Sequence, residues 1–415
     1  MDTGTVGQHR DPVRLTPPAR LLLLIAFKLG GNPLGIRPDA GFCDGAYAGT
    51  LKTRYQRGCV MWSRRGWGRV CASAMLTAGL PAVFAQSRPA TSVAAPVTRN
   101  TLGRVVMAVE NRSSFCYLPL TIADRLGYFA AEGLDVQLRD FTEPGQALQA
   151  MLSGATHLVS GPYSHTISLQ MRGQSIRSIV LQGRTPQIVL GVSLQTMEHY
   201  RQLRDLRGRR IAVTALGSAS HRIARLLLTR AGLGPQDVTY QAFPSASAAV
   251  AAFRSGQVDA ICYTDPVITQ LEQAGQLRVV ADTRTTRGNA DVFGGPLPAG
   301  CLSASADFVE NNPKHCQAIT DAMVHALKWL QTAGPSDLIR IVPETYFLGD
   351  RALYLAAFSR ARESWTPDGL MPEAGPQTTV RMLAHFDDAQ MLQRVNLERT
   401  FTNEFAQKSK ARFRA

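Results

Sequence analysis

The chain has 415 residues, of which 45% are hydrophobic, and its formal net charge is +14. This length exceeds what one hydrophobic core usually serves, so we expect two core-bearing units. No run of about 18 apolar residues occurs, so no membrane-spanning helix is predicted. The basic residues are scattered, which argues against nucleic-acid binding. The densest basic cluster indicates a solvated segment rather than a phosphate site; it comprises Arg201, Arg204, Arg207, Arg209 and Arg210.

Residues 61–85 have the features of an export signal. A basic segment with Arg64, Arg65 and Arg69 precedes a modest apolar run, and a small-residue cleavage signal ends at Ala85. This order predicts cleavage near Ala85 and a periplasmic product. The paired arginines also resemble a twin-arginine signal. A buried amphipathic helix is the alternative, but a proline and glycines interrupt the segment.

The segments on either side of this signal are not expected to belong to the fold. Residues 1–60 show no consistent hydrophobic period, and a signal that starts at residue 61 indicates a start codon assigned too far upstream. We therefore expect 1–60 to be absent from the working protein. Residues 86–100 are polar and contain proline, which predicts a flexible tail.

Strand and helix patterns alternate from Arg104 onward, which predicts α/β architecture with mostly parallel sheets and right-handed crossovers. The first set comprises strands at 104–109, 135–141, 157–161 and 176–183 and helices at 119–133, 145–154 and 164–173. The second set comprises strands at 187–194, 209–215 and 276–282, a helix at 218–232 and the segment 237–265. A returning strand lies within 294–309, and helices follow at 315–332, 336–341 and 350–363.

The segment 237–265 repeats 135–163 without a gap. The identical pairs include Phe141 with Phe243 and Gly154 with Gly256. Each copy reads as strand, helix, strand, so each is expected to supply the middle of one lobe, although chance similarity between two ordinary βαβ units is the alternative. The expected lobes are 101–186 with 290–385, and 187–289, joined by extended crossings near 184–190 and 285–300 and followed by a helical, basic tail at 386–415. Two such lobes build a clamshell with a two-segment hinge and a ligand cleft at the carboxyl ends of both sheets.

Several segments resemble the periplasmic substrate-binding proteins of the nitrate, sulfonate and taurine class, whose fold is shared with the pyrimidine-precursor synthases. They are AVENRSSFCYLPLTIADRLGYFAAEGLDVQL with QALQAMLSGATHLVSG, then LRGRRIAVTALGSASHRIARLLLTRAGL, and GQVDAICYTDPVITQLEQAG. The resemblance spans about 104–335. It implies a monomer that binds a small organic anion: a sulfonate, a nitrate-like ion or a carboxylate, with an aromatic or nitrogen-containing anion as a variant. Its partners would be an ABC permease and the ATPase subunit of that permease, and the permease would be its only contact with the membrane.

The candidate ligand-binding residues follow strands at the expected cleft. In the second lobe, the turn of Gly217, Ser218, Ala219, Ser220 and His221 precedes a helix and offers free backbone amides to an anion, although one serine could simply cap the helix. The equivalent first-lobe turn comprises Gly161, Tyr163, Ser164 and His165. His165 could donate a hydrogen bond to the anion, or it could be only a helix cap or a surface residue. Asn111, Arg112 and Tyr117 follow the first strand, and Arg112 suits a sulfonate or carboxylate. Arg184 could contact the anion or serve the hinge. Tyr263 and Asp265 lie at the rim of the expected cleft. Asp265 could bind an amino group of the ligand, or it could stabilise the hinge.

These observations favour a binding protein over other classes. No catalytic residue, metal or cofactor is predicted, since Cys116, Cys262, Cys301 and Cys316 are dispersed and match no metal spacing. Export would allow these cysteines to pair, although Cys262 lies in an apolar strand pattern typical of a core. The alternatives are an enzyme similar to the pyrimidine-precursor synthases and a sensory partner of a membrane receptor. A DNA-binding regulator is disfavoured, because residues 1–100 offer no recognition helix pair.

Overall fold

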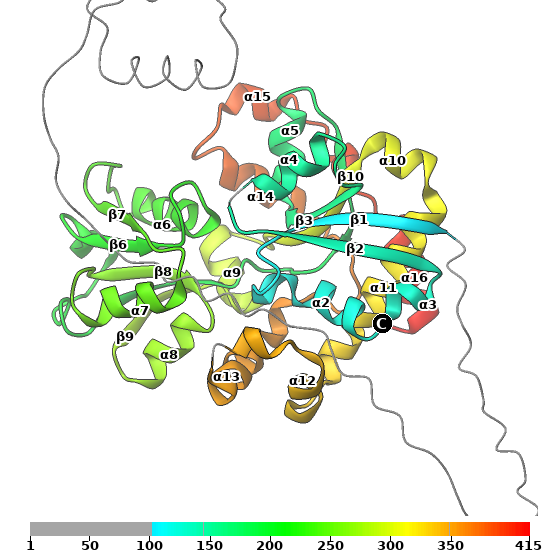
Figure 1. Ribbon diagram of the computed structural model, residues 1–415. Coiled ribbons are helices and arrows are strands. Elements are labelled where there is room, and N and C mark those ends of the chain that lie inside the picture. Colours follow the sequence, from blue (N-terminus) through cyan, green and yellow to red (C-terminus); the bar gives the residue numbers. More distant parts are fainter. Residues whose placement is uncertain (1–101, 144, 348) are drawn as a thin grey trace, which may run out of the picture. The chain divides into compact units, whose positions relative to one another are not determined.

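The computed structural model describes residues 102–143, 145–347 and 349–415. The predicted export signal lies outside these residues, so cleavage near Ala85 stays a prediction. The described residues belong to one compact unit that contains two five-stranded sheets (Figure 1). In this part of the chain, no helix has the length and apolar character needed to cross a membrane.

The first sheet has the strand order β2-β1-β3-β10-β4. Its strands are β1 (Gly103–Glu110), β2 (Leu134–Phe141), β3 (Leu158–Pro162), β4 (Ile176–Leu181) and β10 (Gly300–Ser305). β1 runs parallel to both β2 and β3, whereas β10 is antiparallel to β3 and β4. β10 thus returns to this sheet from far along the chain and is inserted between β3 and β4.

The second sheet repeats this arrangement, with the order β7-β6-β8-β5-β9. Its strands are β5 (Ile188–Ser193), β6 (Arg210–Val213), β7 (Thr239–Ala242), β8 (Ala260–Thr264) and β9 (Leu277–Asp282). β6 is parallel to β7 and β8, and β5 is antiparallel to β8 and β9. The predicted two-lobed α/β fold is confirmed, with one refinement. Each sheet is mixed, because one strand is antiparallel to both of its neighbours. This strand is β10 in the first sheet and β5 in the second, and each follows a segment of the other lobe in the chain.

The repeated segment occupies the same place in both sheets. The first copy forms β2, α4 (Gln146–Leu152) and β3, and the second forms β7, α7 (Ala246–Arg254) and β8. In each sheet, these strands are the edge strand and the central strand. Gly154 and Gly256, which follow the two helices, have φ values of +77° and +72°. Glycine adopts this left-handed conformation without the strain that a Cβ adds, so both copies keep the same helix-ending residue.

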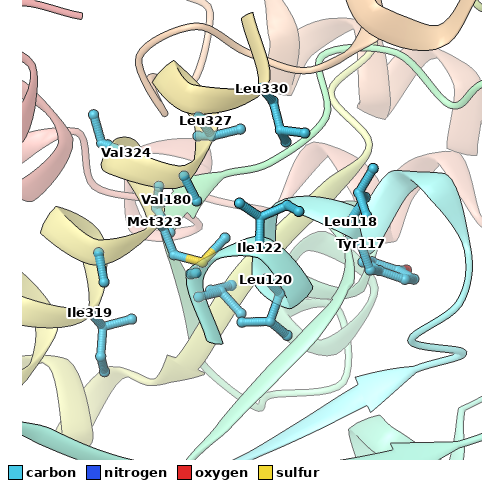
Figure 2. Packing of buried hydrophobic residues seen from close by; sticks show 14 of the residues in the cluster. Tyr117, Leu118, Leu120, Ile122, Val180, Ile319, Met323, Val324, Leu327 and Leu330 are labelled. Carbon is cyan, nitrogen blue, oxygen red and sulfur yellow. The ribbon is translucent and has the colours of Figure 1, made fainter. Parts of the chain in front are cut away.

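Helices cover both faces of the first sheet. α2 (Leu118–Arg125), α3 (Tyr128–Ala131), α11 (Pro313–Thr332) and α16 (Glu404–Phe413) share one large core with it. Figure 2 shows Leu120 and Ile122 of α2 facing Met323 and Leu327 of α11. α4 and α5 (Ser164–Gln170) pack on the opposite face, next to α14 (Gly375–Leu383). Burial of these apolar faces, at about 25 cal/mol per Å² of area removed from water, is the main stabilisation of the lobe.

The second sheet is covered by α6 (Ala219–Arg230) on one face and by α7 with α8 (Val267–Gln273) on the other (Figure 1). α9 (Thr286–Phe293) contributes Val292 and Phe293 to the α6 side. The remaining helices are α10 (Ala306–Asn311), α12 (Pro335–Ile341), α13 (Arg351–Ala361) and α15 (Ala389–Gln393). Short 3-10 segments lie at Phe115–Tyr117, Leu203–Leu206, Glu344–Phe347, Arg362–Ser364 and Leu397–Arg399.

Two local features differ from the sequence-based expectations, and the pairing of the cysteines, which the sequence left open, is a third point. The single helix expected at 119–133 is two helices, because Gly127 adopts φ +71° and interrupts it. The second crossing between the sheets is not extended throughout, since it contains α9. All four cysteines of the described residues are free rather than paired, and Cys262 lies in the core as expected.

Candidate functional site

The candidate residues follow strands that end at a common edge of each sheet. β1 and β3 are parallel neighbours, so the residues after Glu110 and after Pro162 lie at the same edge of the first sheet. β6 and β8 have the same relationship in the second sheet. The turn that follows β6 and Asp265, which follows β8, therefore share an edge as well. The carboxyl ends of parallel strands are the usual location of ligand sites in such sheets.

The second-lobe turn is held together by its own hydroxyl groups. Ser218 caps α6, and its Oγ accepts the amide hydrogen of His221 at 3.4 Å. The hydroxyls of Thr214, Ser218 and Ser220 lie 2.9–3.0 Å from one another. Gly217 has φ +84°, and its amide donates to His221 Nδ1 at 2.8 Å. These contacts fix the turn locally, so the two serines are structural residues of the turn as well as candidate ligand contacts.

The first amides of α6 are unpaired in the part of the chain that the structure describes. Among the described residues, the amides of Ala219 and Ser220 have no hydrogen-bond acceptor, as expected at the start of a helix. His221 accepts at Nδ1, which requires the neutral imidazole with its proton on Nε2. Burial, together with Arg225 and Arg222, lowers the pKa of His221. The start of α6 therefore combines unpaired amides with two arginines in its first two turns, an environment that favours an anion.

His165, in the first-lobe turn, faces the charge of the second lobe. Its Nδ1 is buried and has no hydrogen-bond partner in the described residues. Burial and the nearby positive charge of Arg222 lower the pKa of His165 to about 4, so the imidazole is neutral near pH 7. His165 lies on α5 and Arg222 on α6, so the charge of one helix acts on a side chain of the other.

The tyrosines expected to line the site lie in the cores instead. Tyr163 is fully buried, and its hydroxyl is 2.6 Å from Thr400 Oγ1. Tyr263 is 4% exposed and donates to the carbonyl of Phe243 at 2.7 Å. Tyr117 is 6% exposed within the first core. The three rings are therefore members of the hydrophobic cores.

Three charged candidates form ion pairs or hydrogen bonds with other residues of the protein. Arg112 forms an ion pair with Asp124 at 2.5 Å. Arg184 donates from Nε to the carbonyl of Glu363 at 2.7 Å, which fits the hinge interpretation better than an anion contact. Asp265 is nearly buried and lies 3.3 Å from the guanidinium of Arg284.

Of the other candidates, Asn111 is exposed with φ +58°, and its side-chain oxygen accepts from the hydroxyl of Ser113. Ser164 is half-buried at the start of α5. Gly161 is buried in β3, next to the side chains of Glu110 and His165. The structure therefore brings Gly161, His165 and Glu110 together, whereas Arg112 and Asp265 take part in internal ion pairs.

Two residues of this region were not among the predicted contacts. Arg222 is half-buried and forms no ion pair within the described residues. Glu110 ends β1, and its Oε1 accepts the amide of Gly145 at 3.3 Å. A signal for Arg222 was present in the sequence, since it is the first basic residue after the Gly-Ser turn. For Glu110 the sequence shows only a carboxylate at a strand end.

A surface hollow of about 640 Å³ in the second lobe lies elsewhere. It is lined by α6, β9 and α9 residues and contains none of the candidate residues. Its rim mixes cations and carboxylates, with Arg230 and Arg287 beside Asp282 and Asp291, so its charge favours neither kind of ligand. No group of three or more His, Cys, Asp or Glu residues that could hold a metal ion occurs in the described part of the chain.

The family model described as NMT1/THI5 like matches residues 114–334, just over half of the chain. The chain belongs to this family. A solved structure from Bordetella bronchiseptica RB50 is 42% identical and covers 75% of this chain and 98% of its own, with a TM-score of 0.69. The family match includes both candidate turns and both copies of the repeat.

More distant members of the fold are periplasmic binding proteins. The alkanesulfonate-binding protein SsuA from Xanthomonas axonopodis pv. citri, solved with MOPS bound, is 20% identical and covers 72% of this chain and 98% of its own, with a TM-score of 0.53. The periplasmic nitrate-binding protein NrtA from Synechocystis PCC 6803 is 13% identical and covers 74% and 88%, with a TM-score of 0.56. The desulfurization enzyme DSZB also shares the fold, at 19% identity, coverage of 75% and 100%, and a TM-score of 0.54. The same fold therefore occurs in binding proteins and in an enzyme.

Proposed function

We propose that the protein is an extracytoplasmic solute-binding protein that delivers a small organic anion, a sulfonate or a carboxylate, to an ABC importer. The observation that carries this proposal is the position of Arg222. It is a half-buried cation without an ion pair in the described residues, located one turn into α6, whose first amides are unpaired. A sulfonate or carboxylate would supply the missing partner for the guanidinium and for the amides.

The location of the site supports a binding mechanism in which two lobes hold one ligand. Arg222 belongs to α6 of the second lobe and acts on His165 of the first. We expect an anion bound at Arg222 to lie near the first-lobe turn as well. Contacts from both lobes give the ligand more affinity for a closed arrangement than for an open one, and this difference drives closure. The closed form would then be the one that a permease recognises.

The cysteines favour binding over covalent catalysis. Burial raises the pKa of Cys116 to about 12, and the negative charge of Glu110 acts in the same direction. A nucleophilic cysteine requires a lowered pKa, because the thiolate is the reactive form. The Cys116 thiol near the first-lobe edge therefore stays protonated at neutral pH, and we propose that the ligand is bound without chemical change.

A thermal-shift screen tests the proposal. A ligand that binds only the folded protein raises its Tm by mass action, so sulfonates and carboxylates should raise the Tm in proportion to the logarithm of their concentration. Neutral sugars and simple amines of similar size are the controls. A shift with these compounds, and none with any anion, would overturn the anion-binding function.

A further inference from the structure

The end of α13 contacts both lobes. α13 contributes Tyr354 and Phe358 to the core of the first lobe, so it belongs to that lobe. In its last turn, Arg360 forms an ion pair with Glu272 of α8 at 2.5 Å. α8 contributes Ile268 to a core of the second lobe. This ion pair therefore links the two lobes outside the two crossings that carry the chain between them.

The turn that follows α13 is bonded to the first crossing, residues 182–187. The amide of Arg184 donates to the carbonyl of Ser364 at 2.8 Å, and the amide of Thr366 donates to the carbonyl of Gln182 at 3.0 Å. An antiparallel bridge joins the same two segments. Backbone bonds of this kind fix the turn to the first crossing as a short strand pair would.

The same turn is also bonded to the second crossing, residues 283–299. Glu363 Oε1 accepts the amide hydrogen of Thr286 at 3.0 Å and the hydrogen of the Thr286 hydroxyl as well. Thr286 is the first residue of α9, so the carboxylate lies at the start of a helix, where negative charge is favourable. These bonds lower the pKa of Glu363, which is therefore ionised at neutral pH. One segment of the first lobe thus contacts α8 and both crossings.

The ion pair between the lobes can open without disturbing the second lobe. Glu272 also pairs with the buried guanidinium of Arg284 at 3.0 Å, and this contact keeps it in place. The side chain of Glu272 is only 16% exposed, whereas that of Arg360 is 45% exposed. An ion pair with a largely solvated partner contributes little stability and is easily replaced by water. Breaking the contact of Arg360 therefore costs little, and Glu272 keeps a cation when it is broken.

We propose that Arg360 and Glu363 form a reversible clamp that limits the rotation of the second lobe relative to the first. The clamp consists of the pair of Arg360 with Glu272 and the bonds of Glu363 to Thr286. When it is closed, it fixes α8 and the start of α9 against the first lobe. Opening breaks only these polar contacts, because the apolar face of α13 stays in the first-lobe core. The inference is independent of the ligand, since both contacts join residues outside the candidate ligand site.

Pulsed electron paramagnetic resonance on the full chain tests the clamp. Spin labels on p-acetylphenylalanine at the exposed residues Ala130 and Ala251, one in each lobe, leave the cysteines untouched. The double variant Arg360→Gln with Glu363→Ala removes both contacts. We expect its distance distribution to be about twofold broader or more than that of the unmodified protein, because hinge rotation is then less restricted.

Two further variants and the ionic strength separate the clamp from a general effect. Arg360→Lys keeps the positive charge and should keep the narrow distribution. Arg351→Gln removes a 2.6 Å ion pair of the same helix with Glu344, but this pair lies within the first lobe, so the distribution should not change. Raising the ionic strength from about 0.05 M to about 0.5 M screens exposed charges. This increase should broaden the distribution of the unmodified protein and leave that of the double variant as it is.

Three results would overturn the clamp. The first is a double variant whose distribution matches that of the unmodified protein at both ionic strengths. The second is equal broadening in Arg351→Gln, since any loss of charge on α13 would then loosen the fold. The third is a lowered urea midpoint of the double variant relative to Arg351→Gln, because the broadening would then come from partial unfolding. Broadening in the double variant alone, at an unchanged urea midpoint, is the result we expect.

Discussion

His165 and Arg222 belong to helices on different sheets, yet the charge of Arg222 lowers the pKa of His165. The first follows β3 and the second follows the turn after β6. β3 is the central strand of its sheet, and β6 lies between the edge strand β7 and the central strand β8. The helices that follow β3 and β6 therefore lie close enough for a charge on α6 to act on a side chain of α5.

Arg222→Gln should weaken binding of sulfonates and carboxylates by about tenfold or more, because a charge-assisted hydrogen bond contributes roughly 1.5–3 kcal/mol. The same change should raise the pKa of His165 toward its ordinary value, since a neighbouring positive charge is removed. Calorimetry measures the first effect and an NMR titration of the His165 ring protons measures the second. Arg209→Gln, at an exposed arginine, is the control and should change neither. An unaltered His165 titration in the Arg222 variant would contradict the proximity on which the site is built.

Much of the fold could be predicted from the sequence, because apolar periodicity records which face of each element is buried. The expected strand at 104–109 is β1, and the expected helix at 315–332 is α11. The direction of β5 and β10 could not be predicted, since strand pairing between distant segments depends on the whole sheet. The break at Gly127 was also missed, because a glycine inside a helical pattern is compatible with continuation.

The candidate site was less predictable than the fold. The sequence pattern correctly located the turns at Gly161–His165 and Gly217–His221 at the ends of strands. Side-chain direction could not be read from the sequence, so Tyr163 and Tyr263 were placed at the ligand although they face the cores. The sequence suggests Arg112 as a partner for the anion, whereas in the structure Arg112 pairs with Asp124. Pairing between charges 12 residues apart depends on how a loop meets a helix, which periodicity does not show.

Stability should fall in mild acid because of His165. Its pKa is about 4 in the folded protein, against 6.5 in the unfolded chain, so between these values the unfolded chain binds the extra proton. The contribution is fully present above pH 6.5 and is lost as the pH falls toward 4. We expect His165→Asn to reduce this loss in the free energy of unfolding by roughly 1–3 kcal/mol. Urea denaturation from pH 7.5 to 4.5 measures it, and identical pH profiles for the two proteins would refute the assignment.

Arg284 should be among the most stabilising charged residues. Its buried guanidinium contacts the carboxylates of Asp265, Glu272 and Asp282. Arg284→Met leaves these acids without their shared cation, which should lower the free energy of unfolding by about 3–5 kcal/mol. Arg340→Met, which removes an exposed pair with Asp337, should cost less than about 1 kcal/mol. Chemical denaturation compares the two, and similar small losses would show that the buried cluster does not stabilise the lobe.

Gly191 should tolerate no side chain, because β5 passes close to Leu277. A Cβ at this position would lie 2.6 Å from Leu277 Cδ1 and 2.7 Å from its Cγ. Gly191→Ala should therefore lower the free energy of unfolding by about 1–3 kcal/mol through overpacking. Leu277→Ala in the same chain should recover part of the loss relative to the sum of the single changes. Simple additivity of the two changes in denaturation experiments would show that the clash is relieved elsewhere.

Ser218 should affect both stability and anion binding, because the turn it caps orients the amides of Ala219 and Ser220. Its Oγ accepts from His221 and contacts the hydroxyls of Thr214 and Ser220. Ser218→Ala should cost about 1 kcal/mol of stability, as the loss of a helix cap usually does. Binding of the anion should weaken as well, since the amides are then held less firmly.

Ser245→Ala is the matched control, because Ser245 precedes α7 without forming a cap hydrogen bond. It should leave the free energy of unfolding within about 0.5 kcal/mol of the unmodified protein. Denaturation and calorimetry on both variants separate the two roles of Ser218. A stability loss with undiminished anion affinity would limit Ser218 to capping α6, and the anion would then depend on Arg222 and not on the geometry of the turn.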